Sequence, residues 1–356
     1  MHENKKLLKA MQHLADKSGR GKIRLMEVCG THTQCIAQSG IKHLLPKNVQ
    51  MLSGPGCPVC VTAESFIDLA LEMLSIENTV IATFGDMLKV KGSKYSLADK
   101  IQNENVVTVY SPEDAIKRAI KNKDKTIIFL CVGFETTAPL YASMIKAVYE
   151  MGLNNLCFLT ALKRMEPVLK LILEDGRNCI EGLICPGHVA TITGADYFRF
   201  IAEKYKTPAV ISGFESLDIT CAILMLLRQI SGETSISMQN LYVGCVSDRG
   251  NEIAQKEIQD VFDVDDTVWR AIGMVKNSAL VINKKYKSFD AKARFCLKEN
   301  TTIKRCECIC SEIILGIKSP EQCHLFGKGC TPDSSVGPCM VSSEGACRVK
   351  YRFGGM

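Results

Sequence analysis

Short, strongly apolar segments alternate with longer amphipathic segments over most of this chain. Eight of the short segments have the length and residue types of β-strands: residues 23–28, 48–52, 79–82, 106–109, 126–131, 156–160, 182–185 and 208–211. They are too uniformly apolar to leave one face in water, which is typical of parallel strands covered by helices on both sides. The pattern therefore predicts an α/β fold built on parallel sheets.

The amphipathic segments predict the helices between these strands. Residues 3–17 place apolar side chains on one face of a helix and lysines on the other. A further helix is predicted to open at Ser111-Pro112, where a capping hydroxyl is followed by proline and two acidic residues.

One short repeat suggests how the strands are divided. Gly133-Phe134-Glu135 and Gly213-Phe214-Glu215 each follow a predicted strand and lead into a predicted helix, which indicates two similar α/β units. We expect a first unit at residues 1–132, a second at 133–232 and a third domain at 233–356.

The most unusual stretch is Gly54-Pro55-Gly56-Cys57-Pro58-Val59-Cys60, between a predicted strand and a predicted helix. Pro58 suits the first turn of a helix, so Cys57 should lie at or beside a helix N-terminus, where the thiolate is favoured. The Cys-x-x-Cys pair therefore predicts a redox-active or metal-binding dithiol. The alternative is two buried small hydrophobic residues.

Further chemistry-bearing residues follow other strands. Cys29-Gly-Thr-His32-Thr33 combines a thiol, an imidazole and hydroxyls; Glu135, Thr136 and Thr137 follow another strand, and Cys185-Pro-Gly-His188 a third. Cys29 suits a soft metal, and His32 beside it suits proton handling. Because ligands of open α/β sheets bind outside the carboxyl ends of the strands, we expect these motifs to share one cleft.

Composition narrows the function classes. The chain has 356 residues, a formal net charge of +6 and no long basic run, so we expect no nucleic-acid partner. Its longest apolar stretch is too short for a bilayer, and residues 1–25 lack an apolar signal core, so we expect a cytoplasmic protein with no membrane partner. Neither a dinucleotide fingerprint nor a Walker A loop is present.

Eighteen cysteines in a protein expected in a reducing compartment point to metal, cluster or catalysis rather than disulfides. Eight of them crowd the C-terminal sixty or so residues: Cys296, Cys306, Cys308, Cys310, Cys323, Cys330, Cys339 and Cys347. Their spacing matches neither a zinc ribbon nor a ferredoxin. Cys310, Cys323, Cys330 and Cys347 are candidates for a [4Fe–4S] cluster or a closed structural zinc site, with Cys306 and Cys308 as substitutes.

Several of these motifs together resemble the hydrogenase maturation factor HypD family. The resemblance rests on Cys29-Gly-Thr-His-Thr, on the Gly54–Cys60 stretch, on Gly133-Phe-Glu-Thr-Thr-Ala-Pro, on Cys185-Pro-Gly-His and on Ser342-Ser-Glu-Gly-Ala-Cys347, in order over nearly the whole chain. It implies two Rossmann-like domains with a central cleft and a third domain that carries a [4Fe–4S] cluster.

The resemblance also implies a role in assembling the Fe(CN)2CO unit of [NiFe]-hydrogenases, with the small chaperone HypC and with HypE, whose thiocyanate supplies cyanide. Cys29 would bind iron that carries CN and CO ligands, and Cys57 and Cys60 would be a redox dithiol. Cys310, Cys323, Cys330 and Cys347 would hold the cluster, and Cys339 would be dispensable. Thr136, Thr137 and His188 would donate hydrogen bonds to bound cyanide or to the HypE tail.

Two other readings of the residues stay open. A thiol-disulfide oxidoreductase would use Cys57 and Cys60 for catalysis and hold structural zinc on the C-terminal cysteines, but it leaves Cys29 and His32 without a role. A purely structural interaction protein leaves the glycine- and proline-rich cysteine turns unexplained.

Overall fold

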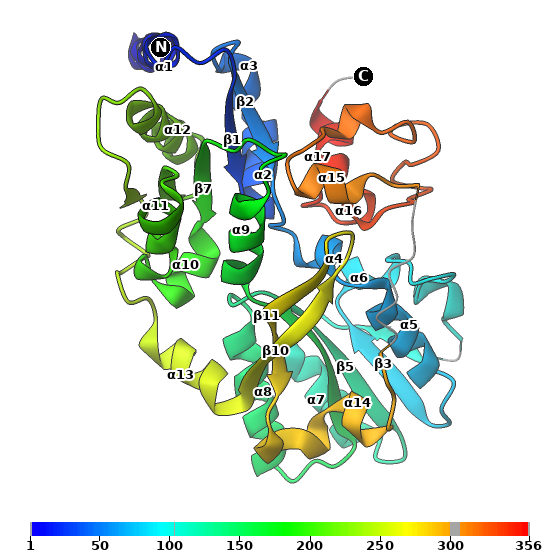
Figure 1. Ribbon diagram of the computed structural model, residues 1–356. Coiled ribbons are helices and arrows are strands. Elements are labelled where there is room, and N and C mark those ends of the chain that lie inside the picture. Colours follow the sequence, from blue (N-terminus) through cyan, green and yellow to red (C-terminus); the bar gives the residue numbers. More distant parts are fainter. Residues whose placement is uncertain (1, 103, 300–306, 355–356) are drawn as a thin grey trace. The chain divides into compact units, whose positions relative to one another are not determined.

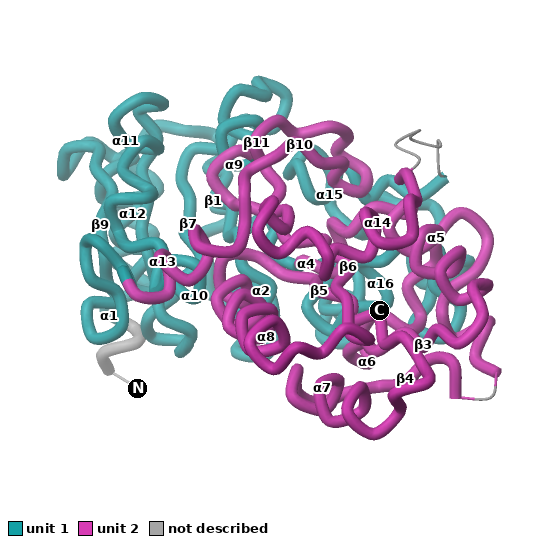
Figure 2. Tube along the Cα trace, turned by 90° about the horizontal axis from the view of Figure 1, so that it is seen from below, with its two compact units in different colours: residues 1–57, 168–252, 307–356 teal, residues 58–167, 253–306 magenta. Residues whose placement is uncertain are grey.

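The computed structural model describes residues 2–102, 104–299 and 307–354 (Figure 1). The chain forms two compact units, and each unit is built from separate stretches of sequence (Figure 2). Unit 1 consists of residues 1–57, 168–252 and 307–356, and unit 2 of residues 58–167 and 253–306.

A parallel sheet forms the centre of unit 1. Its strand order is β2-β1-β7-β8-β9, with β1 Ile23–Glu27, β2 Val49–Ser53, β7 Gly182–Pro186, β8 Ala209–Ser212 and β9 Met238–Asn240. The register pairs Leu25 with Met51 on one side and with Gly182 on the other. Every residue of β7 and β8 is buried, as expected for parallel strands covered on both faces.

Helices and short C-terminal elements complete unit 1: α1 His2–Lys17, α2 Gly30–Gln38, α3 Ile41–Leu44, α9 Met165–Glu174, α10 Gly187–Thr193, η2 Asp196–Phe198, α11 Arg199–Tyr205, α12 Ser216–Ile230, α15 Cys310–Ile314, η4 Pro320–Gln322, α16 Pro338–Val341 and α17 Ala346–Phe353. The apolar stripe of α1 buries Met11 and Leu14 in the same core cluster as Ile223 and Leu226 of α12. The prediction of a helix over residues 3–17 is confirmed. At the other end of the sequence, α17 packs against α2, so the C-terminal segment lies on the element that follows β1.

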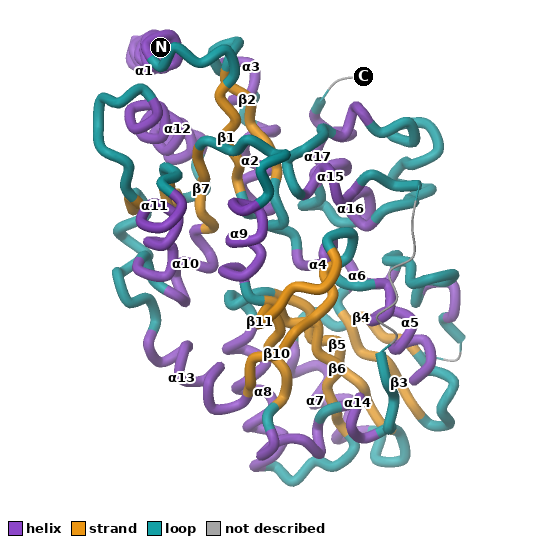
Figure 3. Tube along the Cα trace, viewed as in Figure 1, coloured by secondary structure: helices purple, strands orange, loops and turns teal. Residues whose placement is uncertain are grey.

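Unit 2 contains a mixed sheet of order β10-β11-β6-β5-β3-β4 (Figure 3). Its strands are β3 Thr79–Thr83, β4 Val106–Thr108, β5 Thr126–Gly133, β6 Leu156–Lys163, β10 Phe262–Trp269 and β11 Gly273–Ile282. The strands from β3 to β6 are parallel, whereas β11 pairs antiparallel with both β6 and β10.

The helices of unit 2 cover this sheet and connect its strands: α4 Pro58–Val61, α5 Glu64–Met73, α6 Gly85–Leu88, η1 Ala98–Lys100, α7 Pro112–Lys121, α8 Ala138–Glu150, α13 Glu252–Val261, η3 Lys284–Phe289 and α14 Ala291–Arg294. The predicted start at Ser111-Pro112 is confirmed, because Ser111 and Asp114 form a capping box on α7. No helix in the described part of the chain combines the length and apolarity needed to cross a bilayer.

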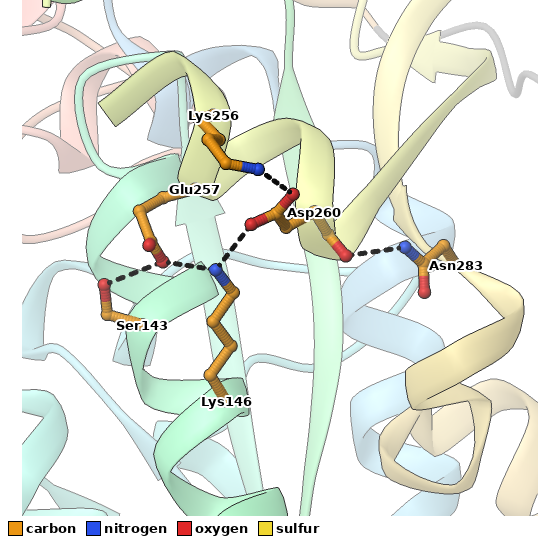
Figure 4. A network of polar contacts seen from close by, with 6 residues as sticks. All are labelled: Ser143, Lys146, Lys256, Glu257, Asp260 and Asn283. Atoms are coloured by element: carbon orange, nitrogen blue, oxygen red, sulfur yellow. Dashed lines mark hydrogen bonds and ion pairs between the residues drawn. The ribbon is translucent and has the colours of Figure 1, made fainter. Parts of the chain in front are cut away.

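A polar network joins α8 to α13 within unit 2 (Figure 4). Lys146 Nζ on α8 lies 2.9 Å from both Glu257 Oε2 and Asp260 Oδ2 on α13. Lys256 Nζ also reaches Asp260, at 3.1 Å, and Asn283 Nδ2 donates to the Asp260 carbonyl oxygen at 2.9 Å. The network fixes α13 on the surface of α8.

All eight predicted strands are present, and the mixed α/β class with two mainly parallel sheets is as expected. The division into units differs from the three consecutive segments expected from the sequence. Because β1 pairs with β7 rather than with β3, unit 1 takes strands from both sides of unit 2 in the sequence. Each unit carries one Gly-Phe-Glu copy, after β5 in unit 2 and after β8 in unit 1.

Candidate functional site

Cys29 and Cys57 lie on two loops of unit 1 that are pressed together, one after β1 and one after β2. Cys29 is the N-cap of α2, and Gly30 N–H donates to the Gly56 carbonyl oxygen at 3.3 Å. A Cβ atom on Gly56 would lie 2.4 Å from Cys29 N and Cα, a contact that backbone atoms cannot relieve. Only glycine at position 56 therefore allows the two cysteine loops to approach this closely.

Cys29 is only 7% exposed, and this burial is the main influence on the pKa of its thiol. It raises the pKa of the Cys29 thiol to about 12, against a smaller opposing effect from the backbone N–H groups of His32 and Thr31. The sulfur is therefore protonated at neutral pH. A soft metal ion that binds here has to displace this proton.

Glu27 supports the Cys29 loop from the end of β1, and it was not among the predicted site residues. Its Oε2 accepts a hydrogen bond from Cys29 N–H at 3.1 Å, and its Oε1 accepts one from Thr33 Oγ1 at 2.6 Å. Burial raises its pKa to about 7, although the hydrogen bonds from Thr33 and Cys29 oppose the shift. The available signal in the sequence was an acid directly after the apolar residues Leu25 and Met26, at the end of the predicted strand.

Two imidazoles flank Phe214 in unit 1. The His188 ring stacks on Phe214 at a centroid distance of 4.0 Å, and the fully buried His32 ring lies 4.8 Å from it. His32 Nε2 lies 2.9 Å from the Gly213 carbonyl oxygen, so it carries the hydrogen and leaves a lone pair on Nδ1, which has no hydrogen-bond partner among the described residues. Burial lowers the pKa of His32 to about 4 and also lowers the pKa of His188. Both rings are neutral at physiological pH.

A C-terminal segment, residues 342–347, covers these loops. Cys57 Sγ donates to Ser342 Oγ at 3.2 Å, Thr31 Oγ1 donates to Glu344 Oε1 at 3.3 Å, and Gln34 Nε2 donates to the Ser343 carbonyl oxygen at 2.8 Å. Ser342 and Glu344 belong to a motif noticed in the sequence, but only its cysteine was assigned a role there. The segment connects the Cys29 and Cys57 loops to the C-terminal cysteines.

Those cysteines surround a small cavity of unit 1, which we call the thiol cavity. The thiols that line it are those of Cys308, Cys323, Cys330, Cys339 and Cys347. Ile313, Leu325, Phe326 and Met340 supply apolar walls. Burial raises the pKa of Cys347 above its usual value, and the neighbouring thiols Cys308, Cys330 and Cys323 add to the shift. Within the described ranges, no three His, Cys, Asp or Glu side chains converge on one point as ligands of a single ion.

Cys310 and Cys339 are in contact with each other beside this cavity. Cys310 is not among the residues that line the thiol cavity, and its Sγ lies 2.8 Å from Cys339 Sγ. Both thiols are nearly completely buried. Cys339, interpreted in the sequence as dispensable, is thus in the middle of the cysteine group, and Cys308 lines the cavity. Cys306 lies outside the described residues.

Cys60, the second cysteine of the Cys-x-x-Cys pair, belongs to unit 2. The boundary falls between Cys57 and Pro58, and Cys60 is buried in α4 of unit 2. The predicted placement of Cys57 beside a helix start is confirmed, since α4 begins at Pro58.

Glu135, Thr136 and Thr137 lie in unit 2, between β5 and α8. Glu135 is 5% exposed, and its Oε1 accepts a hydrogen bond from Met165 N–H at 2.8 Å. Thr137 is the N-cap of α8 and Thr136 is half-buried. The structure therefore brings Cys29, His32, Cys57 and His188 together in unit 1, whereas a cleft shared with the unit 2 residues stays a prediction.

The fold and the site define a cysteine-rich α/β protein with two groups of thiols: Cys29 and Cys57 on neighbouring loops, and the cysteines around the thiol cavity. Comparisons with known proteins relate this kind of protein to hydrogenase formation. A family model described as "HypD: Hydrogenase formation hypA family" matches residues 2–354. The chain belongs to the HypD family.

Relatives from distant organisms extend over nearly the same length. Hydrogenase maturation factor HypD of Escherichia coli is 38% identical over 333 residues, 93% of this chain and 89% of that protein. HypD2 of Bradyrhizobium diazoefficiens is 39% identical over 357 residues, 98% of this chain and 93% of its own. A Methanocaldococcus jannaschii protein named for hydrogenase expression and formation is 42% identical over 352 residues, 98% of this chain and 96% of that protein.

Proposed function

We propose that this chain is a cytoplasmic scaffold on which the Fe(CN)2CO unit of a [NiFe]-hydrogenase is assembled, together with a HypC-type small chaperone and a HypE-type thiocyanate carrier. Membership of the HypD family supports the role in hydrogenase maturation. The observation that supports the finer proposal is the hydrogen-bonded contact of residues 342–347 with the Cys29 and Cys57 loops, which connects these two thiols to the C-terminal cysteines within unit 1.

Cys29 binds the iron substrate in this proposal. Cyanide and CO prefer low-spin Fe(II), and a thiolate supplies the soft, electron-rich ligand that this state needs. Iron displaces the proton that burial otherwise holds on Cys29. Glu27 fixes the backbone of Cys29, and the neutral His32 offers its Nδ1 lone pair to a proton or a donor beside the iron.

Cys57 and Cys60 supply two electrons for cyanide release. The two thiols and the carrier thiocyanate, R–S–C≡N, give one Cys57–Cys60 disulfide, the free carrier thiol R–SH and HCN. The S–CN bond breaks, the S–S bond forms, and the two thiol protons leave with the carrier sulfur and the cyanide. Thr136, Thr137 and His188 donate hydrogen bonds to cyanide nitrogens or to the carrier tail, and Glu135 holds the start of α9 through Met165.

We assign a [4Fe–4S] cluster to the thiols that line the thiol cavity, because five cysteines gather there within an otherwise apolar lining. Cys323, Cys330 and Cys347 supply three ligands, and the fourth is Cys308 or Cys310. We favour Cys308, because it lines the cavity and Cys310 does not. When bound, such a cluster supplies single electrons that return a disulfide to its thiols.

The decisive experiment is anaerobic purification with iron and sulfide analysis, Mössbauer spectroscopy and infrared spectroscopy, with and without the co-expressed small chaperone. We expect a four-iron cluster plus one further iron with cyanide and CO stretches. Cys29→Ala should remove those stretches and leave the cluster. Thiol trapping with mass spectrometry should find Cys57 and Cys60 in both dithiol and disulfide forms during turnover.

Three other results would each contradict part of this proposal. Zinc in place of iron, with no cyanide or CO bands, would support a thiol-disulfide oxidoreductase that holds structural zinc. A dithiol that stays reduced throughout turnover would remove the redox role of Cys57 and Cys60. Unchanged maturation in Thr136→Val would remove that residue from cyanide binding.

A further inference from the structure

A cavity of about 460 Å³ opens in unit 1 beside the outer strand of its sheet, and neither Cys29 nor Cys57 lines it. All five residues of β2 line this cavity, together with parts of α2, α3, α15 and α17. We call it the β2 cavity. The function proposed above gives it no part.

The outer side of β2 is an unpaired sheet edge. β2 is the first strand in the order β2-β1-β7-β8-β9, so within the described ranges it pairs with β1 and with no other strand. Val49 N–H donates to the Pro46 carbonyl oxygen at 2.8 Å and therefore points away from β1. Backbone groups alternate sides along a strand, so those of Met51 and Ser53 point the same way. Such an edge is a template for another strand.

The cavity wall carries an excess of positive charge. The lysines that line it are Lys22, Lys42, Lys47, Lys318 and Lys350, and the acidic residue among its lining is Glu321. Lys350 Nζ pairs with Glu321 Oε1 at 2.6 Å, and Lys318 pairs with Glu312 at 2.8 Å. The structure gives Lys22, Lys42 and Lys47 no ion pair with any residue it describes. Surrounding protein atoms lower the pKa of Lys42, and Lys350 adds to this.

Apolar and amide groups form the deeper part of the cavity. Ile36, Met51 and Val349 are buried there. Gln50 Oε1 is completely buried and has no hydrogen-bond partner among the described residues. A buried amide oxygen of this kind needs a donor, which a bound chain can supply.

We propose that the β2 cavity docks an extended acidic segment of a partner protein, which adds to β2 as a further strand. Backbone hydrogen bonds to the free edge would give affinity, and alternate acidic side chains would meet the lysines. A second copy of this chain fits less well, because pairing two β2 edges would bring two sets of lysines together.

The test uses the full chain, purified anaerobically, and the synthetic peptide acetyl-Asp-Val-Glu-Val-Glu-Val-Asp-amide in isothermal titration calorimetry. We expect saturable one-to-one binding that weakens as salt is added. Two matched peptides separate the contributions: one with Asn and Gln in place of the acids, and one with N-methylated alternate amides. Each should bind at least tenfold more weakly.

Variants locate the site. The double variant Lys42→Gln, Lys47→Gln should weaken binding about tenfold, and its fold should be intact because both side chains are exposed. Lys204→Gln, an exposed lysine of unit 1 paired with Glu174, should bind like the unaltered chain. Absence of saturable binding, equal affinity for the neutral or N-methylated peptide, or unaltered affinity in the double variant would each overturn the proposal. Dimerisation that competes with the peptide would assign the edge to a second copy.

Discussion

Lys163 and Cys29 are buried ionisable residues in different units, and burial disfavours the charged form of both. Lys163 is 2% exposed, its Nζ donates to the Val268 carbonyl oxygen at 2.9 Å, and it lies 5.2 Å from the Trp269 ring. Burial lowers the pKa of Lys163 to about 7. Because the unfolded chain holds this proton up to a pH of about 10 and the folded chain does not, Lys163 makes stability rise between those pH values.

Lys163→Met should remove this rise. The fall of the pKa from 10.5 to about 7 corresponds to roughly 4 kcal/mol between pH 7 and pH 10, and the variant should be the more stable protein near pH 7. Urea unfolding of both proteins at several pH values measures the difference between their free energies of unfolding. The buried cysteines change stability in the opposite direction with pH, but they do so equally in both proteins and cancel in the difference. The exposed Lys276→Met serves as control, and parallel pH profiles for Lys163→Met and the unaltered chain would contradict the argument.

The fourth ligand of the proposed cluster is also a question about single residues. Cys308→Ala should lose the cluster absorbance and most iron and sulfide, because Cys308 lines the thiol cavity. Cys310→Ala should retain the cluster, since Cys310 is not among the residues that line this cavity. Iron and sulfide counts on anaerobic protein decide it, and the reverse pattern would restore Cys310 as the ligand.

At the scale of elements, α13 is held to α8 by the network around Lys146. The side chains of Lys146, Glu257 and Asp260 are 22%, 31% and 36% exposed, so solvent screens these ion pairs only partly. The contacts join two helices that are far apart in the sequence. Loss of the shared cation would leave two carboxylates of α13 side by side.

Lys146→Met should lower the free energy of unfolding by about 1 kcal/mol, and the loss should shrink in high salt. Lys256→Met is the control, because that lysine is 74% exposed and its ion pair among the described residues is with Asp260. Its effect should stay below about 0.5 kcal/mol. If the two variants lost equal free energy of unfolding in denaturant melts, the network around Lys146 would contribute no more than a single exposed ion pair.

The sequence predicted individual helices and strands better than it predicted single functional residues or the division into units. The strands from β1 to β8 are short, mainly apolar runs bounded by glycine, proline or polar residues, so their existence follows from local pattern. β10 was missed because its middle, Asp263 to Asp266, is acidic and exposed, a pattern that hides an edge strand of an antiparallel pair. Ser342 was missed because its role depends on a contact with Cys57, 285 residues away in the sequence. Glu27 was missed although its partners Cys29 and Thr33 are close to it in the sequence.

For the whole molecule, the unit division could not be predicted because it depends on one nonlocal choice, the pairing of β1 with β7. Two consecutive α/β units explain the same strands equally well from sequence. Each unit also has its own core: Ile23, Leu25 and Leu226 belong to the core of unit 1, and Phe129 and Phe158 to that of unit 2.

Cluster loading should therefore stabilise the two units unequally. A cofactor that binds only the folded thiol cavity stabilises the unit that contains it. Hydrogen exchange of loaded and iron-free protein should show added protection at residues 307–354 and at 29–34, which residues 343 and 344 contact, but not in β5 or β6. Equal gains in both units would show that they unfold as one body.

The interleaved chain also sets an order of events during synthesis. Leu25 meets Gly182 only after roughly 150 further residues have been made, which takes about 10 to 30 s on the ribosome. Throughout that time one side of β1 is without its neighbour, and a chaperone that shields nascent chains has a defined target there. The cavity cysteines, residues 308–347, come after every strand of both sheets, so the scaffold is made before the residues that would hold a cluster.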